Sequence, residues 1–349
     1  MTHHLIFIAY NLFNVESLFK AHLIISNVRL VRVEDAVGQV LGYDTTYVGK
    51  DGAAVLLPKG HVITRDDVEK LKDSGVYFVW IEGDEESSDL MYEWEIAEIM
   101  ANALAGENTY VRLARQGSAW ILSSVNGVLR VNVSGLQEFN LNGNVLLITK
   151  PSMTGVIKDE LVGIVDVVPL SMRREDVNEL LRYRGLVSVV PFSRRRIGIV
   201  ITGTEIYQGR KKDLYYPVIK ARADRYGWEI VYNTVVPDDE ERIMAAIREA
   251  VNNGAEAVVV TGGMSVDPTD RTPIAIRKLG ARVMAYGIPI KPTTMTMIAL
   301  LDDTPILAVS AGGIYYSEHN AIDIFLPRLM ANLIPSREEI AAMGHGGLL

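Results

Sequence analysis

No cysteine occurs among the 349 residues of the chain. Disulfide bonds, thiolate zinc sites and cysteine nucleophiles are therefore excluded. Basic residues are in the minority, with 35 Lys and Arg against 43 Asp and Glu and a formal net charge of −8. The overall negative charge of the chain repels nucleic acid, so we expect no nucleic-acid partner. A local basic patch is still compatible with this composition.

Long uncharged apolar runs are also lacking. The N-terminal stretch from Leu5 to Ile25 is apolar, but Glu16 and Lys20 interrupt it before it reaches a length that could span a bilayer. It also lacks the positively charged start and the small-residue cleavage site of a signal peptide. We therefore expect no signal peptide, no transmembrane segment, no membrane partner and a cytoplasmic location.

The composition is that of an ordinary globular protein, with 48% hydrophobic and 22% charged residues. The length suffices for two or three domains. The changes of pattern along the chain predict the following division: an N-terminal extension at 1–27, a small α+β domain at 28–106, a β-rich domain at 107–192, an α/β domain at 193–332 and a C-terminal tail at 333–349.

Strands and helices alternate regularly from Ile197 onward. Strands are expected at 197–201, 229–235, 257–260, 282–285 and 306–309, and helices at 215–226, 238–253, 273–279 and 314–330. This alternation predicts an α/β fold with a doubly wound, mostly parallel sheet.

The preceding part of the chain has shorter elements. Thr64 is expected to cap a helix at 65–74, and Asn126-Gly127 to close a hairpin between strands at 120–125 and 128–133. The basic segment 193–196 is interpreted as a solvated hinge in preference to a binding site.

The segment after the buried run Ala257–Val260 has the composition of a ligand loop. Gly262 and Gly263 allow a sharp turn and close approach to the main chain. Asp267 and Asp270 follow, and neither belongs to a segment with an apolar face. Thr272 is expected to cap the next helix and Pro273 to begin it. A connecting turn with solvated acids is the alternative interpretation.

Two further loops are expected at the same carboxyl edge of the sheet, where open α/β sheets bind ligands. They are Thr202-Gly203-Thr204-Glu205 and Pro237-Asp238-Asp239. The glycine and threonine turns suit a phosphate, whereas the acids require Mg²⁺ or another hard cation. Capping of a helix is an alternative role for the two aspartates, but not for Glu205 in its glycine turn. Lys291-Pro292 is either a rigid turn aimed at this edge or a stiffened connection.

Residues 197–330 resemble the molybdopterin-binding domain shared by molybdopterin molybdotransferases of the MoeA and gephyrin E-domain type and adenylyltransferases of the MogA type. The resemblance rests on four motifs in order: Thr202-Gly203-Thr204-Glu205, Pro237-Asp238-Asp239, Thr261-Gly262-Gly263-Met264-Ser265 through Asp270, and Lys291-Pro292. Residues 28–192 look more loosely like the smaller domains of the molybdotransferase.

The resemblance implies a molybdopterin phosphate held by the glycine turns, in a homodimer. The residues that it implies for cofactor binding are Thr202, Gly203, Thr204, Thr261, Gly262, Gly263, Met264, Ser265, Lys291, Pro292, Gly312 and Gly313. Glu205, Asp238 and Asp270 match the acids that the family uses around Mg²⁺, molybdate or tungstate, and are the implied catalytic and metal-binding residues.

The chain departs from the molybdotransferase pattern at three places. A Lys-Pro-Gly-Lys-Pro loop is replaced by 291–295, a Leu-Pro-Gly-Asn-Pro-Val-Ser turn by 309–315, and an Asp-Gly-Tyr-Ala segment by 50–54. Ligand binding is therefore better supported than metal insertion. Three hypotheses stand: a molybdotransferase-like or adenylyltransferase-like enzyme, a nucleotide pyrophosphatase similar to CinA, and a non-catalytic pterin carrier or regulator. His345, near the end of the chain, is either solvated or able to reach a neighbouring site.

Overall fold

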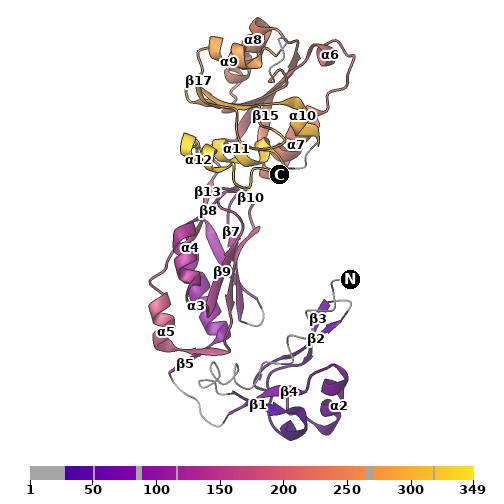
Figure 1. Ribbon diagram of the computed structural model, residues 1–349, viewed down its shortest axis with the longest axis vertical. Helices are drawn as coiled ribbons and strands as arrows, with labels where there is room; N and C mark the ends of the chain where they lie inside the picture. The colour runs from indigo at the N-terminus through magenta and orange to yellow at the C-terminus, as the bar shows by residue number, and fades with distance from the viewer. Residues whose placement is uncertain (1–27, 50–51, 84–88, 115–116, 265–269, 317–318) are drawn as a thin grey trace.

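The computed structural model describes residues 28–49, 52–83, 89–114, 117–264, 270–316 and 319–349. The predicted extension at 1–27, Ser265 and Asp267 lie outside these ranges. Figure 1 shows three bodies in a row along the long axis, with the elements up to β4 at one end and those from β14 onward at the other. Among the described residues, no helix combines the length and the apolar character needed to cross a bilayer.

The first body packs one helix and short strand pairs around a small core. Its elements are β1 (Val28–Arg32), η2 (Val33–Ala36), β2 (Thr45–Gly49), β3 (Gly52–Leu57), α2 (Arg65–Asp73) and β4 (Phe78–Glu82). The pairs β1–β4 and β2–β3 are antiparallel. The Thr64 side chain accepts from the Asp67 N–H and the Asp67 carboxylate bonds back to Thr64, so the predicted cap is confirmed.

The middle body contains a four-stranded and a three-stranded sheet, in the orders β6-β7-β11-β9 and β10-β8-β13, and the pair β12-β5. Its elements are β5 (Leu90–Tyr92), α3 (Glu93–Leu104), β6 (Thr109–Leu113), β7 (Ser118–Ser123), β8 (Gly127–Val131), α4 (Val133–Asn140), β9 (Val145–Thr149), β10 (Gly155–Val156), β11 (Leu161–Val167), β12 (Ser171–Arg173), α5 (Arg174–Leu180) and β13 (Val187–Pro191). The buried side chains of α3 share one cluster with those of the strands, so the boundary predicted at 106 divides a single core. The division into domains otherwise stays a prediction.

The predicted hairpin at Asn126-Gly127 is wrong, because β7 and β8 belong to different sheets. The Asn126 side chain donates to the carbonyl oxygen of Tyr226 at 3.0 Å and accepts from the Lys158 N–H at 2.8 Å. A Cβ at Gly127 would lie 2.2 Å from the carbonyl oxygen of Val190. The Asn-Gly pair therefore serves a crossing between sheets, where glycine allows close approach of β13.

The last body is built on a six-stranded sheet of order β15-β14-β16-β19-β18-β17. All pairs are parallel except those of β18, which runs against both of its neighbours. The elements are β14 (Arg196–Thr202), α6 (Thr204–Tyr207), α7 (Tyr215–Tyr226), β15 (Glu229–Val236), α8 (Glu240–Asn252), β16 (Ala257–Thr261), α9 (Thr272–Lys278), β17 (Arg282–Tyr286), β18 (Thr296–Leu301), β19 (Thr304–Val309), α10 (Ala311–Tyr316), α11 (Ala321–Met330) and α12 (Arg337–Ala342).

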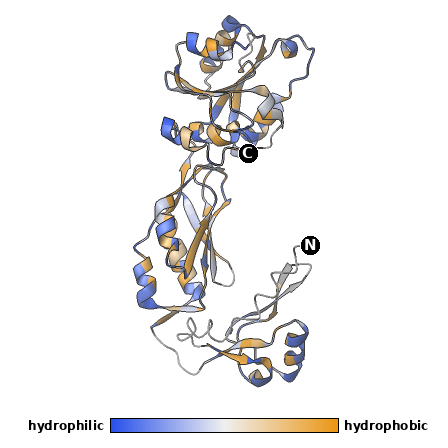
Figure 2. Ribbon diagram, viewed as in Figure 1, coloured by the Kyte–Doolittle hydropathy of each residue, from blue (hydrophilic) through white to orange (hydrophobic). Residues whose placement is uncertain are grey.

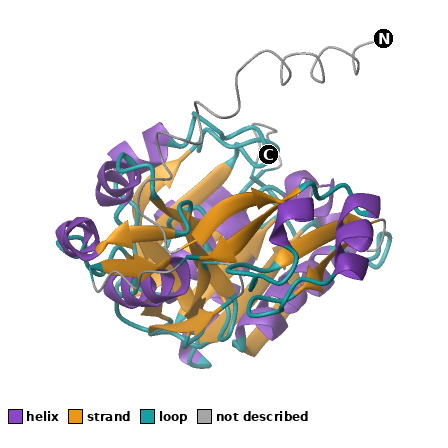
Figure 3. Ribbon diagram, turned by 90° about the horizontal axis from the view of Figure 1, so that it is seen from below, coloured by secondary structure: helices purple, strands orange, loops and turns teal. Residues whose placement is uncertain are grey.

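Helices cover both faces of this sheet, as predicted. Ile199 and Val259 belong to one buried cluster, with α7, α11 and α12, whereas Val200 and Val260 belong to another, with α8 and α9. Neighbouring residues of one strand face opposite sides, so the central strands are apolar on both faces. Figure 2 shows this apolar interior and the hydrophilic outer faces of the helices, and Figure 3 shows helices around the strands.

Three details differ from the expected pattern. Strand β18 is an addition to the predicted elements, and the helix expected at 314–330 is divided into α10 and α11. The division follows from Asn320, whose side chain accepts from the Ile322 N–H at 2.9 Å and caps α11. The segment 193–196 is not a free hinge, because the Ser193 and Arg194 N–H groups donate to the carbonyl oxygen of Met330 at 3.0 Å and 2.9 Å.

Candidate functional site

The strand order brings three of the predicted loops to one edge of the sheet. Thr202 at the end of β14 pairs with Val236 of β15, and Ile201 pairs with Thr261 at the end of β16. The strands are parallel, so the segments that follow them leave the sheet on the same side. The structure thus places 203–205, 237–239 and 262–264 next to one another.

Three threonines are buried at this edge. Thr202, Thr261 and Thr272 are at most 2% exposed. The Thr272 hydroxyl donates to the carbonyl oxygen of Gly262 at 2.9 Å. Its oxygen also lies 3.4 Å from the hydroxyl oxygen of Thr202. Thr272 is therefore a tie between α9 and the glycine turn, and not the expected helix cap.

The Thr261 hydroxyl has no hydrogen-bond partner within the described ranges. A buried hydroxyl left unpaired costs about 1–3 kcal/mol. Thr261 ends β16, where the predicted ligand loop starts, and its side chain faces the same side of the sheet as those of Val259 and Ile201. This is the observation that points most directly to a missing polar partner at the site.

The glycine turn is pressed against β14. Gly262 and Gly263 have φ of +93° and +56°. A Cβ at Gly262 would lie 2.2 Å from the Thr202 carbonyl oxygen, and one at Gly263 would lie 2.8 Å from the Thr272 hydroxyl. Both positions require glycine, since side chains are disfavoured at positive φ and no room exists for them.

The two neighbouring aspartates have separate roles. The Asp238 carboxylate accepts from the N–H of Thr204 at 2.8 Å and from its hydroxyl at 3.0 Å. Asp239 is the cap of α8 and accepts from the N–H of Arg242 at 2.9 Å. Helix capping therefore explains Asp239, whereas Asp238 ties the loop after β15 to the loop after β14.

The position of Glu205 is also explained by a helix, although the sequence predicted a glycine turn there and no helical role for this residue. It lies in the first turn of the short helix α6, about half exposed, with Lys211 at 3.3 Å. The pKa of Glu205 is lowered by a hydrogen bond from its own backbone N–H and by the Lys211 ammonium. The Lys211 ammonium thus already offsets part of the charge of this carboxylate.

The three predicted metal ligands are not gathered around one point. No group of three or more His, Asp or Glu side chains that could hold a metal ion occurs in the described part of the chain. Glu205, Asp238 and Asp270 are all described, so they do not form a preformed site. Their role toward Mg²⁺ stays a prediction, which requires oxygen atoms of a ligand to complete the coordination.

Met264 contributes its side chain to the core beneath the sheet and is 1% exposed. Only its backbone is therefore available to a ligand, and its carbonyl oxygen accepts from the Tyr286 hydroxyl at 3.1 Å. Sequence reasoning missed Tyr286. It also missed Glu240, which pairs with Arg271 at 3.2 Å and with Lys278, and so joins the first turn of α8 to both ends of α9.

The remaining predicted residues form a second group beside the first. A Cβ at Gly313 would lie 3.1 Å from the Pro292 carbonyl oxygen, so the two segments pack together. Gly312 has open space around it. Lys291 is exposed, and its backbone pairs with the C-terminal segment: its N–H donates to the carbonyl oxygen of Gly347 at 2.8 Å. The two groups meet where the Gly262 N–H donates to the carbonyl oxygen of Val309 at 3.3 Å.

Comparisons with known proteins agree on the last body. Residues 198–331 match the family model described as "Probable molybdopterin binding domain", and residues 30–82 match a "Domain of unknown function (DUF8806)".

Of the curated relatives that match the chain in part, three carry different names. They are a molybdopterin molybdenumtransferase of Bacillus subtilis (28% identical, 38% of this chain and 33% of the relative), a molybdopterin adenylyltransferase of Pyrococcus furiosus (30%, 26% and 54%) and a CinA-like protein of Syntrophus aciditrophicus (34%, 27% and 20%). The chain thus spans about half, or less, of the length of these relatives.

Proposed function

We propose that this chain, whose residues 198–331 form a divergent molybdopterin-binding domain of the MoeA and MogA-like kind, binds molybdopterin or its adenylylated form in molybdenum cofactor biosynthesis. The observation that carries the proposal is the unpaired Thr261 hydroxyl at the edge where three glycine or aspartate loops meet. A phosphate oxygen reaching this edge would supply the missing partner.

The chemistry of the edge suits a phosphorylated pterin. Backbone N–H groups of the glycine turns and the threonine hydroxyls are donors to phosphate oxygens. Thr202, Gly203, Thr204, Thr261, Gly262 and Gly263 would hold the phosphate, and Lys291 would supply positive charge from the neighbouring group. Asp238, Glu205 and Asp270 would hold Mg²⁺ only when the ligand contributes oxygen atoms, which explains why they are not gathered beforehand.

Replacement of Asp238 is the sharpest test of this assignment. Asp238→Ala removes two hydrogen bonds that fix Thr204, so we expect affinity for molybdopterin, measured by fluorescence in the presence of Mg²⁺, to fall about tenfold. Asp239→Ala is the matched control: it should cost about 1 kcal/mol of stability through the lost cap and leave affinity unchanged. If the unmodified protein bound no pterin, we would abandon the proposal.

A second candidate function is pyrophosphate cleavage, which the 34% identity to a CinA-like protein favours. The same glycine turns would then hold a dinucleotide phosphate. Hydrolysis of ADP-ribose with Mg²⁺ distinguishes the two: we expect no turnover above a no-enzyme blank for a pterin-binding protein. Robust hydrolysis that Asp270→Ala abolishes would favour the nucleotide function.

The part the protein plays in the pathway is also a proposal. A molybdotransferase-like or adenylyltransferase-like activity and a carrier role share the same pterin site, and co-purification of pterin without turnover would favour the carrier. We further propose a cytoplasmic homodimer, which light scattering of the purified protein would test.

A further inference from the structure

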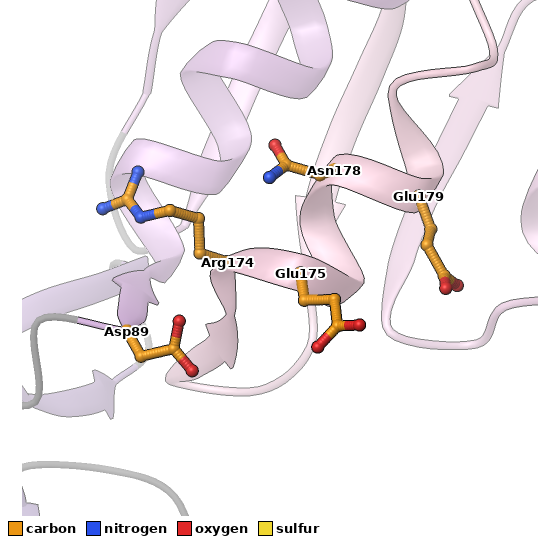
Figure 4. A pocket seen from close by; sticks show the side chains of 5 residues that line it. All are labelled: Asp89, Arg174, Glu175, Asn178 and Glu179. Carbon is orange, nitrogen blue, oxygen red and sulfur yellow. The ribbon is translucent and has the colours of Figure 1, made fainter.

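The open hollow along α5 is a large surface cavity, with a volume of about 510 Å³, but its side chains do not converge. Figure 4 shows Glu175 and Glu179 pointing away from Arg174 and Asn178. Such an arrangement offers no common point for a ligand. A smaller cavity elsewhere in the molecule has the opposite character.

This smaller cavity, of about 340 Å³, lies between α11, the loop 151–154 and the C-terminal segment 343–349. In Figure 1 the C-terminus lies beside α11, near β10 of the middle body. None of the residues assigned to the pterin site lines this cavity. It is therefore a separate site, and a ligand bound there would not depend on the proposed function.

Arg328 gives the cavity its charge. The guanidinium is partly buried, and its hydrogen bond is a long one from Nε to the carbonyl oxygen of Met153 at 3.4 Å. It lies 5.9 Å from the ring centre of Phe325 and has no ion pair with a described carboxylate. Burial lowers the pKa of Arg328, and the charge of Glu339 opposes this effect.

Asp323 also lines the cavity, but its carboxylate already has an ion-pair partner other than Arg328. It binds the Arg222 guanidinium in bidentate fashion, at 3.0 Å and 3.1 Å. A partly buried charge without a partner is costly, and a planar guanidinium matches the paired oxygen atoms of a phosphate or carboxylate. The terminal nitrogens of Arg328 are thus suited to an external oxyanion.

The other walls add an apolar surface and a fixed boundary. Met153, Ile290, Ile324 and Met343 line the cavity, with His319 and His345 at its polar side. The C-terminal wall is held in place by backbone hydrogen bonds between 347–349 and Lys291. A Cβ at Gly347 would lie 2.1 Å from the Pro289 carbonyl oxygen, so this wall depends on glycine.

We propose that this cavity binds a small organic anion, with an oxyanion head group on Arg328 and an apolar body against the methionine and isoleucine side chains. The head group is a phosphate or a carboxylate, which one guanidinium recognises in the same way.

Calorimetric titration of the full chain with phenyl phosphate, benzoate and inorganic phosphate tests the proposal. We expect at least one aromatic probe to bind, more tightly than inorganic phosphate does, and the better of the two identifies the head group. Arg328→Gln should weaken that binding about tenfold or more. Arg282→Gln, at an exposed arginine of β17, should leave it unchanged.

Arg328→Met separates binding from folding. It keeps an unbranched side chain about as long as the arginine stem up to Nε and removes the unpaired charge, so we expect a melting temperature no lower than that of the unmodified protein and no rise when the probe is added. The proposal would be overturned if neither aromatic probe bound, if binding survived in Arg328→Gln, or if both Arg328 variants unfolded.

Discussion

Gly262→Ala is expected to destabilise the chain by about 3 kcal/mol and to abolish pterin binding. The new Cβ would lie 2.2 Å from the Thr202 carbonyl oxygen, a backbone atom that moves only if β14 moves. The positive φ of +93° adds about 1 kcal/mol for a residue with a side chain. Urea denaturation measures the stability, and pterin fluorescence the binding.

Gly280→Ala is the matched control for this experiment. Gly280 has a φ of +88°, but no atom lies within 4 Å of its added Cβ. The control therefore carries the backbone penalty of about 1 kcal/mol without the collision. Equal losses of stability in the two variants would contradict the close approach of the glycine turn to β14.

Asp323→Ala is expected to cost about 3 kcal/mol of stability. The change removes the bidentate ion pair with Arg222, in which the Arg222 side chain is 18% exposed and that of Asp323 is 16% exposed. It also removes the hydrogen bond that the Asp323 carboxylate accepts from the Asn320 N–H at 3.1 Å. Both contacts hold α11, which packs on the sheet and forms a wall of the Arg328 cavity. Thermal and urea denaturation measure the effect.

Asp224→Ala shows what an exposed pair is worth in the same protein. Asp224 pairs with Lys220 on the surface of α7, with side chains 62% and 47% exposed. Its loss should cost no more than about 0.5 kcal/mol, because water and salt screen such a pair. A similar cost for both aspartates would show that the pair on α11 contributes no more than a surface contact.

The meeting of the loops at the carboxyl edge could be predicted because its signals are local. Apolar runs end at Thr202 and Thr261, and a glycine turn follows each, so strand, loop and edge are readable within a few residues. The roles of individual side chains were not readable. Asp238 and Asp239 look alike in the sequence, and only the position of Thr204 separates a tie from a cap.

Strand pairing was the second limit. Asn126-Gly127 is an excellent hairpin signal, yet the partners of β7 and β8 are chosen by distant strands and by Tyr226. Strand β18 was not predicted, because the prediction expected a helix between each pair of successive strands. The signal is present: Asp302-Asp303 between two apolar runs predicts a tight antiparallel turn, and Asp302 indeed has a φ of +51°.

The reversed strand β18 also bears on how the protein folds. β17, β18 and β19 pair with their neighbours in sequence, so this half of the sheet can form from contacts close in the chain, whereas β14 meets β16 only across α7, β15 and α8. Only the pairing of β16 with β19 joins the halves, across α9 and the whole of the reversed segment. Closure of the long loops behind the β14–β16 and β16–β19 pairings is slow. Thr261 pairs with Ile201 on one side and with Val309 on the other, so the edge proposed to bind the pterin is completed only when both long-range pairings have formed.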